Sequence, residues 1–340
     1  MGSSATKAPI PVIYDGDMGG DDMWGIMVAL AHPDRFDVKG ITSVFGNVDC
    51  DHATRNVLSL LSHYGYGSVP VYKGASKPLY GACMFGDGAY GDDGIGGVIL
   101  AEKESLRARP DATNFIIETV LNSPEPVTIF GTGPSTNIAQ ALLAAPQITD
   151  NIDRIILMGG GLSPGPKPNV SERSGNITIH SEFNFFQDPY AANVIFNNDN
   201  VETHVMTMDA TQNIHLDPLK KARLQAFNDA AFGDVVVRFL APAEALDRPK
   251  FGVDGPFIHD PNVVTYVLDP ALYAGRRAYV SVEEYPQEDV PMQEMRHGKM
   301  KAVWDRNANV KVIDRMTDRD GVFNLMESSL RRFAQGRYPH

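Results

Sequence analysis

Short apolar runs alternate with amphipathic segments along most of the chain. The apolar runs predict buried strands at residues 11–14, 38–45, 69–73, 127–130, 154–158 and 202–208. The amphipathic segments predict helices at residues 21–31, 51–63, 111–122, 136–144, 188–197 and 322–333. Strands that alternate with helices are typical of βαβ units, and strands that are apolar throughout are typical of a sheet covered on both faces. The pattern therefore predicts an α/β fold with an open, mostly parallel sheet flanked by helices.

After about residue 215 the pattern becomes more helical. No linker rich in Pro, Gly or Ser divides the chain, so we expect a single domain over residues 10–337. Residues 1–9 contain a Gly-Ser-Ser-Ala-Thr run and no apolar stretch of the kind that a signal peptide needs. We expect them to form a flexible tail.

The composition disfavours several classes of protein. The 340 residues include 30 Lys and Arg against 42 Asp and Glu, which gives a net charge of −12 and disfavours binding to nucleic acid or to an anionic membrane. No apolar run approaches the roughly 20 residues that cross a bilayer. Two cysteines, Cys50 and Cys83, are too few for a disulfide framework and favour a reducing compartment. These features predict a cytoplasmic protein with a small-molecule ligand.

An acidic turn follows the first predicted strand. It holds four carboxylates within eight residues and no Lys or Arg: Asp15, Asp17, Asp21 and Asp22. Ligands of open parallel sheets bind beyond the carboxyl ends of the strands, which is where this turn lies. Like charges this close repel unless a cation compensates them, and carboxylate oxygens prefer Ca²⁺ or Mg²⁺. The alternative is that Asp21 or Asp22 caps the next helix while the other carboxylates are solvated.

The acidic turn does not fit two other metal-binding motifs well. An EF-hand loop that begins at Asp15 requires Asp or Asn at its fifth position and Glu at its twelfth, where this chain has Gly19 and Ile26. A phosphatase of the haloacid dehalogenase type, with Asp15 as nucleophile, normally has Thr or Val where this chain has Gly19. That phosphatase remains an alternative, as does a non-catalytic protein that binds Ca²⁺ or a nucleoside.

Further polar motifs suit a ligand rich in hydroxyl groups. Glu182 and Asn184 are predicted to share one face of an extended segment, and Asn176 lies shortly before them. His259 and Asp260 are adjacent, so that an oxygen ligand and a group that titrates near neutrality lie side by side. Each motif is weak evidence on its own.

Together these motifs resemble those of the inosine-uridine preferring nucleoside hydrolases. Residues 15–22 match the pattern Asp-x-Asp-x-Gly-x-Asp-Asp of that family. Val-Phe-Gly-Asn at 44–47, Gly-Thr-Gly at 131–133, Glu-Phe-Asn at 182–184 and His-Asp-Pro at 259–261 follow in the family's order. The resemblance covers roughly residues 10 to 335. It implies a Ca²⁺-dependent enzyme, a homodimer or homotetramer, that hydrolyses the N-glycosidic bond of a ribonucleoside to ribose and a free base.

The resemblance also implies roles for individual residues. Three carboxylates and one backbone carbonyl would hold the Ca²⁺: Asp17, Asp22, Asp260 and the carbonyl of Thr132. A second group would bind the ribose: Asp21, Asn47, Met158, Asn176, Glu182 and Asn184. Asp15 would support the site from behind. Asp17 would take the proton of the attacking water, and His259 would assist the leaving base.

One position departs from several relatives. Where relatives that accept pyrimidines carry His, this chain has Tyr90, so a partnership between two histidines at the base is not available. This departure favours purine ribosides such as inosine and guanosine. An aromatic ring that stacks on the base could come from Tyr90, Phe185 or Phe251, and the sequence does not choose among them.

Overall fold

The computed structural model describes residues 8–81, 88–101, 105–162, 175–284, 291 and 294–336. The tail predicted over residues 1–9 therefore lies almost entirely outside the described residues, as does Cys83. Among the described residues, no helix combines the length and the apolar character needed to cross a membrane.

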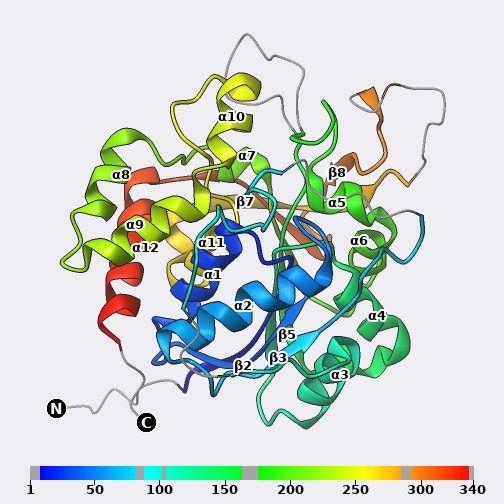
Figure 1. Cartoon of the computed structure of the whole chain (residues 1–340). Helices are drawn as coiled ribbons and strands as arrows, with labels where there is room; N and C mark the ends of the chain where they lie inside the picture. Colours follow the sequence, from blue (N-terminus) through cyan, green and yellow to red (C-terminus); the bar gives the residue numbers. More distant parts are fainter. Residues whose placement is uncertain are drawn as a thin grey trace, which may run out of the picture.

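The described strands form one nine-stranded sheet (Figure 1). Across the sheet the order is β3 (Val71–Lys73), β2 (Phe36–Ser43), β1 (Ile10–Gly16), β4 (Val127–Gly131), β5 (Ile152–Met158), β6 (Thr203–Met206), β9 (Val310–Met316), β7 (Tyr273–Val282) and β8 (Met300–Trp304). Neighbours from β3 to β9 pair in parallel, whereas β7 pairs antiparallel with both β9 and β8. The predicted α/β fold with an open, mostly parallel sheet is confirmed.

Helices cover both faces of the sheet. They are α1 (Gly20–Leu30), α2 (Cys50–Tyr64), α3 (Ala112–Asn122), α4 (Thr136–Ala144), α5 (Phe183–Gln187), α6 (Pro189–Phe196), α7 (Met208–Thr211), α8 (Pro218–Gln225), α9 (Ala230–Leu240), α10 (Ala243–Phe251), α11 (Pro261–Leu268) and α12 (Arg319–Gln335), with short 3₁₀ turns at Pro146–Asn151 and Pro270–Leu272. Successive residues of β1 enter different hydrophobic clusters: Val12 and Tyr14 pack with α1, α2, α11 and α12, and Ile13 packs with α3, α4 and α6. This alternation explains why the strand is apolar throughout.

The carboxyl-terminal part differs from the sequence prediction. Helices α8 to α11 follow residue 215 as expected, but β7, β8 and β9 then complete the sheet. In β7 the buried residues Ala278, Val280 and Val282 alternate with the more exposed Tyr279 and Ser281. A period of two was therefore present in the sequence, and it marks an antiparallel strand covered on one face only.

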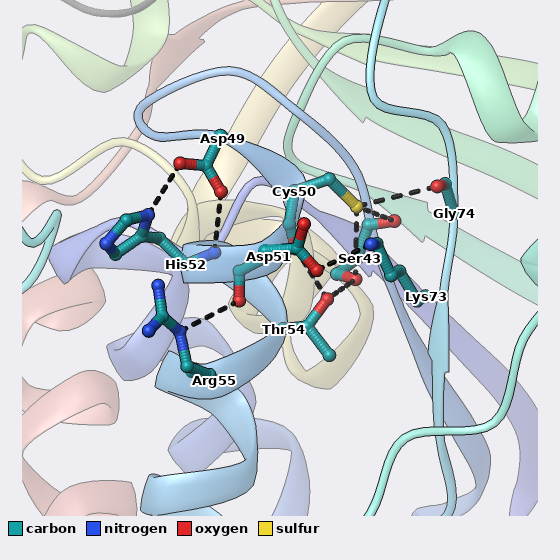
Figure 2. A network of polar contacts seen from close by, with 9 residues as sticks. All are labelled: Ser43, Asp49, Cys50, Asp51, His52, Thr54, Arg55, Lys73 and Gly74. Atoms are coloured by element: carbon teal, nitrogen blue, oxygen red, sulfur yellow. Dashed lines mark hydrogen bonds and ion pairs between the residues drawn. The ribbon is translucent and has the colours of Figure 1, made fainter.

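A polar network holds the loop between β2 and α2 (Figure 2). The hydroxyl of Ser43, the last residue of β2, lies 2.7 Å from the hydroxyl of Thr54 on α2. Cys50 is the first residue of α2, and its thiol donates to the backbone carbonyl of Gly74 at 3.5 Å. Asp49 caps α2 by accepting a backbone N–H of its first turn at 2.9 Å. These contacts fix both ends of the loop that carries Asn47.

Candidate active site

A cavity brings together most of the predicted site residues. Nine of the twelve line it: Asp21, Asn47, Thr132, Met158, Asn176, Glu182, Asn184, His259 and Asp260. They follow β1, β2, β4 and β5 or begin α11, so residues up to 239 positions apart meet at the carboxyl ends of neighbouring parallel strands. The remaining three, Asp15, Asp17 and Asp22, do not line the cavity, but they are buried and accept hydrogen bonds from the lining residues Thr132 or Asn47.

In the acidic turn the backbone at Gly16 and Gly19 lies close to the carboxylate of Asp22. Strand β1 ends at Gly16, Met18 takes a positive φ of 54°, and α1 begins at Gly20. A Cβ at position 16 would lie 2.2 Å from Oδ1 of Asp22, so only glycine fits there. The other oxygen of Asp22 accepts the backbone N–H of Gly19 at 2.9 Å. The turn therefore directs its carboxylates inward and does not leave them solvated.

Two carboxylates of the acidic turn and a third from the start of α11 form a cluster that could hold a metal ion. The ligand atoms of Asp21, Asp22 and Asp260 lie within 4.8 Å of one another, and all three residues are buried. Burial, reinforced by the neighbouring carboxylates, raises the pKa of Asp22 and of Asp260 well above the usual range. Buried carboxylates in such proximity are costly unless a cation lies among them, and an all-oxygen donor set suits a hard cation. The residues present therefore fit a metal ion.

Asp17 adjoins this cluster. Its carboxylate accepts the backbone N–H of Asn47 at 2.7 Å and the side-chain amide of the same residue at 2.9 Å, and it contacts the carboxyl of Asp22. Burial raises the pKa of Asp17 to about 7. Its role as a metal ligand stays a prediction, as does the assignment of the clustered Asp21 to ribose.

Asp15 lies outside the cavity lining and contacts residues next to it. Its side chain accepts hydrogen bonds from Thr42 at 2.5 Å and from Asn137 at 2.7 Å, and its backbone carbonyl accepts the N–H of Thr132 at 2.8 Å. It is fully buried and does not line the cavity. A nucleophile has to reach the substrate, so this position argues against the phosphatase alternative.

Glu182 and Asn184 line the cavity, but the prediction of an extended segment is wrong. Glu182 caps α5, and its carboxylate accepts the backbone N–H groups of Asn184, Phe185 and Gly160 at 2.8, 3.1 and 2.9 Å. The side-chain amide of Asn184 donates to the backbone carbonyls of Thr132 and Met158, both at 3.0 Å. The free N–H groups of a helix start attract a carboxylate, and this favours the short helix over a strand.

The buried carboxyl of Glu182 leads to a prediction about pH. Burial raises its pKa to about 7, so the folded protein holds a proton that the unfolded chain releases from about pH 4.5 upward. The metal-free protein should therefore lose stability between pH 5 and 8. We expect Glu182→Gln to flatten this decline by about 1–3 kcal/mol in urea unfolding. Glu125→Gln, at an exposed carboxylate, is the control and should leave the slope unchanged. Equal slopes in all three proteins would contradict the prediction.

His259 reaches the cavity from the segment before α11. Its Nδ1 lies 2.7 Å from the hydroxyl of Thr211 on α7, which leaves Nε2 as the nitrogen for a ligand. Burial lowers the pKa of His259, and the negative charge of Asp21 opposes that effect. The ring is therefore fixed in place beside the acid cluster.

The structure also separates the three aromatic candidates. All three belong to the hydrophobic clusters, but only Tyr90 also lines the cavity. Residues that the sequence analysis missed complete the lining: Ala89, Ile177, Phe183, Ala243, Leu246, Asp247 and Lys250. The last four have the helical spacing i, i+3, i+4, i+7, but only the packing of α10 shows which face of that helix meets the cavity.

Comparison with known proteins places the chain among the enzymes that hydrolyse nucleosides. It belongs to the inosine-uridine preferring nucleoside hydrolase family, whose sequence model matches residues 12–324. The protein is accordingly an N-glycosyl hydrolase that acts on nucleosides.

Relatives of both base preferences are similar to the chain. The pyrimidine-specific ribonucleoside hydrolase RihA of Citrobacter koseri is 35% identical over 283 residues, which cover 81% of this chain and 84% of that protein. The structure of a purine-preferring ribonucleoside hydrolase from Gardnerella vaginalis superposes with a TM-score of 0.80 at 26% identity, over 96% of this chain and 99% of that one. The plant nucleoside hydrolase PpNRh1 gives a TM-score of 0.81 at 26% identity, over 95% and 99%.

Proposed function

We propose that the protein is a Ca²⁺-dependent ribonucleoside hydrolase that favours the purine ribosides inosine and guanosine. The observation that carries the proposal is the buried carboxylate cluster of Asp21, Asp22 and Asp260, of which Asp21 and Asp260 line a cavity rich in amide and carboxylate groups. Such a cavity can bind the vicinal hydroxyls of a ribose next to a cation.

The cation would be held by side-chain and backbone oxygens. Asp17, Asp22, Asp260 and the backbone carbonyl of Thr132 are the proposed ligands, and Asp21 adjoins them. When bound, Ca²⁺ would neutralise the clustered charge, orient the ribose hydroxyls and make a nearby water more acidic.

Three groups of residues would then carry the reaction. Asn47, Asn176, Glu182 and Asn184 bind the ribose, with Met158 packed against it. Asp17 accepts a proton from the attacking water, whose oxygen bonds to C1′ of the ribose. The C1′–N bond breaks through an oxocarbenium-like transition state, and its electron pair leaves with the base. His259 supplies a proton to that base.

The proton supplied by His259 leads to a second prediction. Replacing His259 with alanine should lower kcat for inosine by about 100-fold or more, because hypoxanthine leaves poorly without a proton. Nitrophenyl riboside, whose leaving group needs no proton, should slow by less than about 10-fold. Steady-state kinetics on both substrates measure this, with His52→Ala on the surface of α2 as the control. Equal losses on both substrates would rule out proton donation.

The preference for purines rests on Tyr90. It lines the cavity. By the family resemblance it stands where several relatives that accept pyrimidines carry histidine, so that a phenol ring takes the place of a second imidazole. The named relatives include enzymes of either preference, so an assay has to decide.

A reducing-sugar assay tests the proposed function. Inosine, guanosine, adenosine, uridine and cytidine are incubated with the enzyme in the presence of Ca²⁺, and ribose release is measured. We expect the highest kcat/KM for inosine and guanosine. Release of no ribose from any nucleoside would overturn the proposal, and faster release from uridine or cytidine would overturn its purine preference.

A further inference from the structure

A second cavity lies near the amino ends of the parallel strands, whereas the active site lies at their carboxyl ends. Four neighbouring strands, β4, β5, β6 and β9, each place one polar residue in its lining: Thr128, Arg154, His204 and Lys311. Two positions further along each strand, on the same face, the residue belongs to the hydrophobic core: Phe130, Ile156, Met206 and Ile313. One face of the sheet therefore changes from apolar to polar where the cavity begins.

This cavity is separate from the active site. Arg154 lines it, whereas Met158, four residues later on the same strand, lines the active-site cavity. Four residues of a strand span about 13 Å. None of the described residues lines both cavities. The second cavity has a volume of about 530 Å³, which is in the range of sites that bind small molecules.

The two carboxylates among the described lining residues are already paired. Glu202 lies 2.9 Å from Nε2 of His204 and forms an ion pair with Arg277 at 2.7 Å. Asp153 accepts a hydrogen bond from Nε of Arg154 at 2.7 Å. The protein itself therefore compensates both negative charges, and they oppose an incoming anion only weakly.

Two cations of this cavity keep hydrogen-bond donors that the described residues do not use. Arg154 contacts Asp153 through Nε, and its two terminal nitrogens have no partner among the described residues. The ammonium of Lys311 donates to the hydroxyl of Tyr266 at 3.0 Å and forms no ion pair with a described residue. Because only β6 lies between β5 and β9, the two side chains start about 10 Å apart across the sheet. Two long side chains can hold one anionic group across such a gap.

His204 lies between these cations on β6 and is 4% exposed. Burial lowers the pKa of His204, and Glu202 opposes that effect, so the ring is neutral at pH 7. An ionised carboxylate only accepts hydrogen bonds, so Nε2 carries the ring proton and Nδ1 is an acceptor. Nδ1 is buried and has no hydrogen-bond partner among the described residues. Buried polar atoms without a partner are rare unless a water or a ligand supplies one.

We propose that this cavity binds a small organic phosphate, whose phosphate group is held by Arg154 and Lys311. Guanidinium and ammonium groups are the side chains with which proteins bind phosphate. With Arg277, the described lining has three cations against two carboxylates, although the chain as a whole has a net charge of −12. The cavity is far larger than a phosphate ion, and Tyr266 and Pro270 offer the organic part an apolar contact.

Isothermal titration calorimetry with two probes tests this site. Phenyl phosphate represents the organic phosphates and has no vicinal diol for the active site, and inorganic phosphate represents the free anion. We expect phenyl phosphate to bind at one site per chain with a Kd below about 1 mM, and inorganic phosphate to bind more weakly. No saturable binding of either probe overturns the inference. Equal or tighter binding of inorganic phosphate overturns the organic ligand and assigns the cavity to the free anion.

Variants assign the binding to its residues. Lys311→Met and Arg154→Met should each raise the Kd for phenyl phosphate about 10-fold or more, because each removes a charged hydrogen-bond donor. Lys39→Met is the matched control and should keep the wild-type Kd, because Lys39 pairs with Asp37 and does not line the cavity.

A cooperative thermal transition shows that each variant is folded. If a methionine variant is unfolded, Lys311→Gln or Arg154→Gln takes its place. Undiminished binding in folded variants of both residues contradicts the assignment. None of these measurements uses a nucleoside, so the inference can fail while the proposed hydrolase activity stands, and the reverse also holds.

Discussion

Replacing Asp17 with alanine should lower nucleoside hydrolysis by about 10³-fold or more and leave the protein folded. The loss is large because this one carboxylate is both the proposed proton acceptor and a proposed ligand of the cation. Folding should persist because burial already raises the pKa of Asp17 to about 7, so the fold gains little from keeping the group charged. Ribose release at saturating inosine measures the first effect, and thermal unfolding measures the second.

The matched control for this experiment is Asp51→Ala. Asp51 lies in the first turn of α2 and pairs with Lys73, and its side chain is 72% exposed. We expect this variant to keep wild-type turnover. A folded Asp17→Ala protein with near-normal kcat would remove the central residue of the mechanism.

Removing the cation should abolish activity and destabilise the fold. Without a positive charge, the buried carboxylates of Asp22 and Asp260 face each other and the carboxylates of Asp21 and Asp17. We expect a chelator to reduce hydrolysis at least 100-fold and Ca²⁺ to restore it. Ca²⁺ at 100 times its Kd should stabilise the fold by about 2.7 kcal/mol, or raise Tm by about 5 °C.

The effect of Ca²⁺ on Tm should depend on pH. The raised pKa values of Asp17, Asp22 and Asp260 mean that the metal-free fold retains protons which the unfolded chain loses above about pH 4. Its stability therefore falls as pH rises through 7, and Ca²⁺ should raise Tm more at pH 8 than at pH 6. Asp22→Asn should lose this response. Full activity in the chelator would contradict a metal-dependent mechanism.

Local sequence patterns predicted the central strands β1, β4 and β6 because these strands are buried along nearly their whole length. In β1, successive apolar residues enter opposite cores, so the whole strand has to be apolar and is easily recognised. The segment from Glu182 to Asn184 misled the prediction because a strand and a short capped helix can both place two polar groups near a ligand. What decided between them was the supply of backbone N–H groups from Phe185 and from Gly160, and the second of these is not local.

The sequence by itself determined the fold class and the acidic turn, since both follow from residues close together along the chain. Asp15, Asp17, Asp21 and Asp22 occupy a strand end, where ligands of parallel sheets bind, and their spacing matches that of a known family. Only the tertiary structure decided that Asp260 lies within the same cluster and that one face of α10 lines the cavity. Contacts between residues so distant in sequence depend on how helices pack on the sheet, and a helix alone does not show which of its faces will meet a ligand.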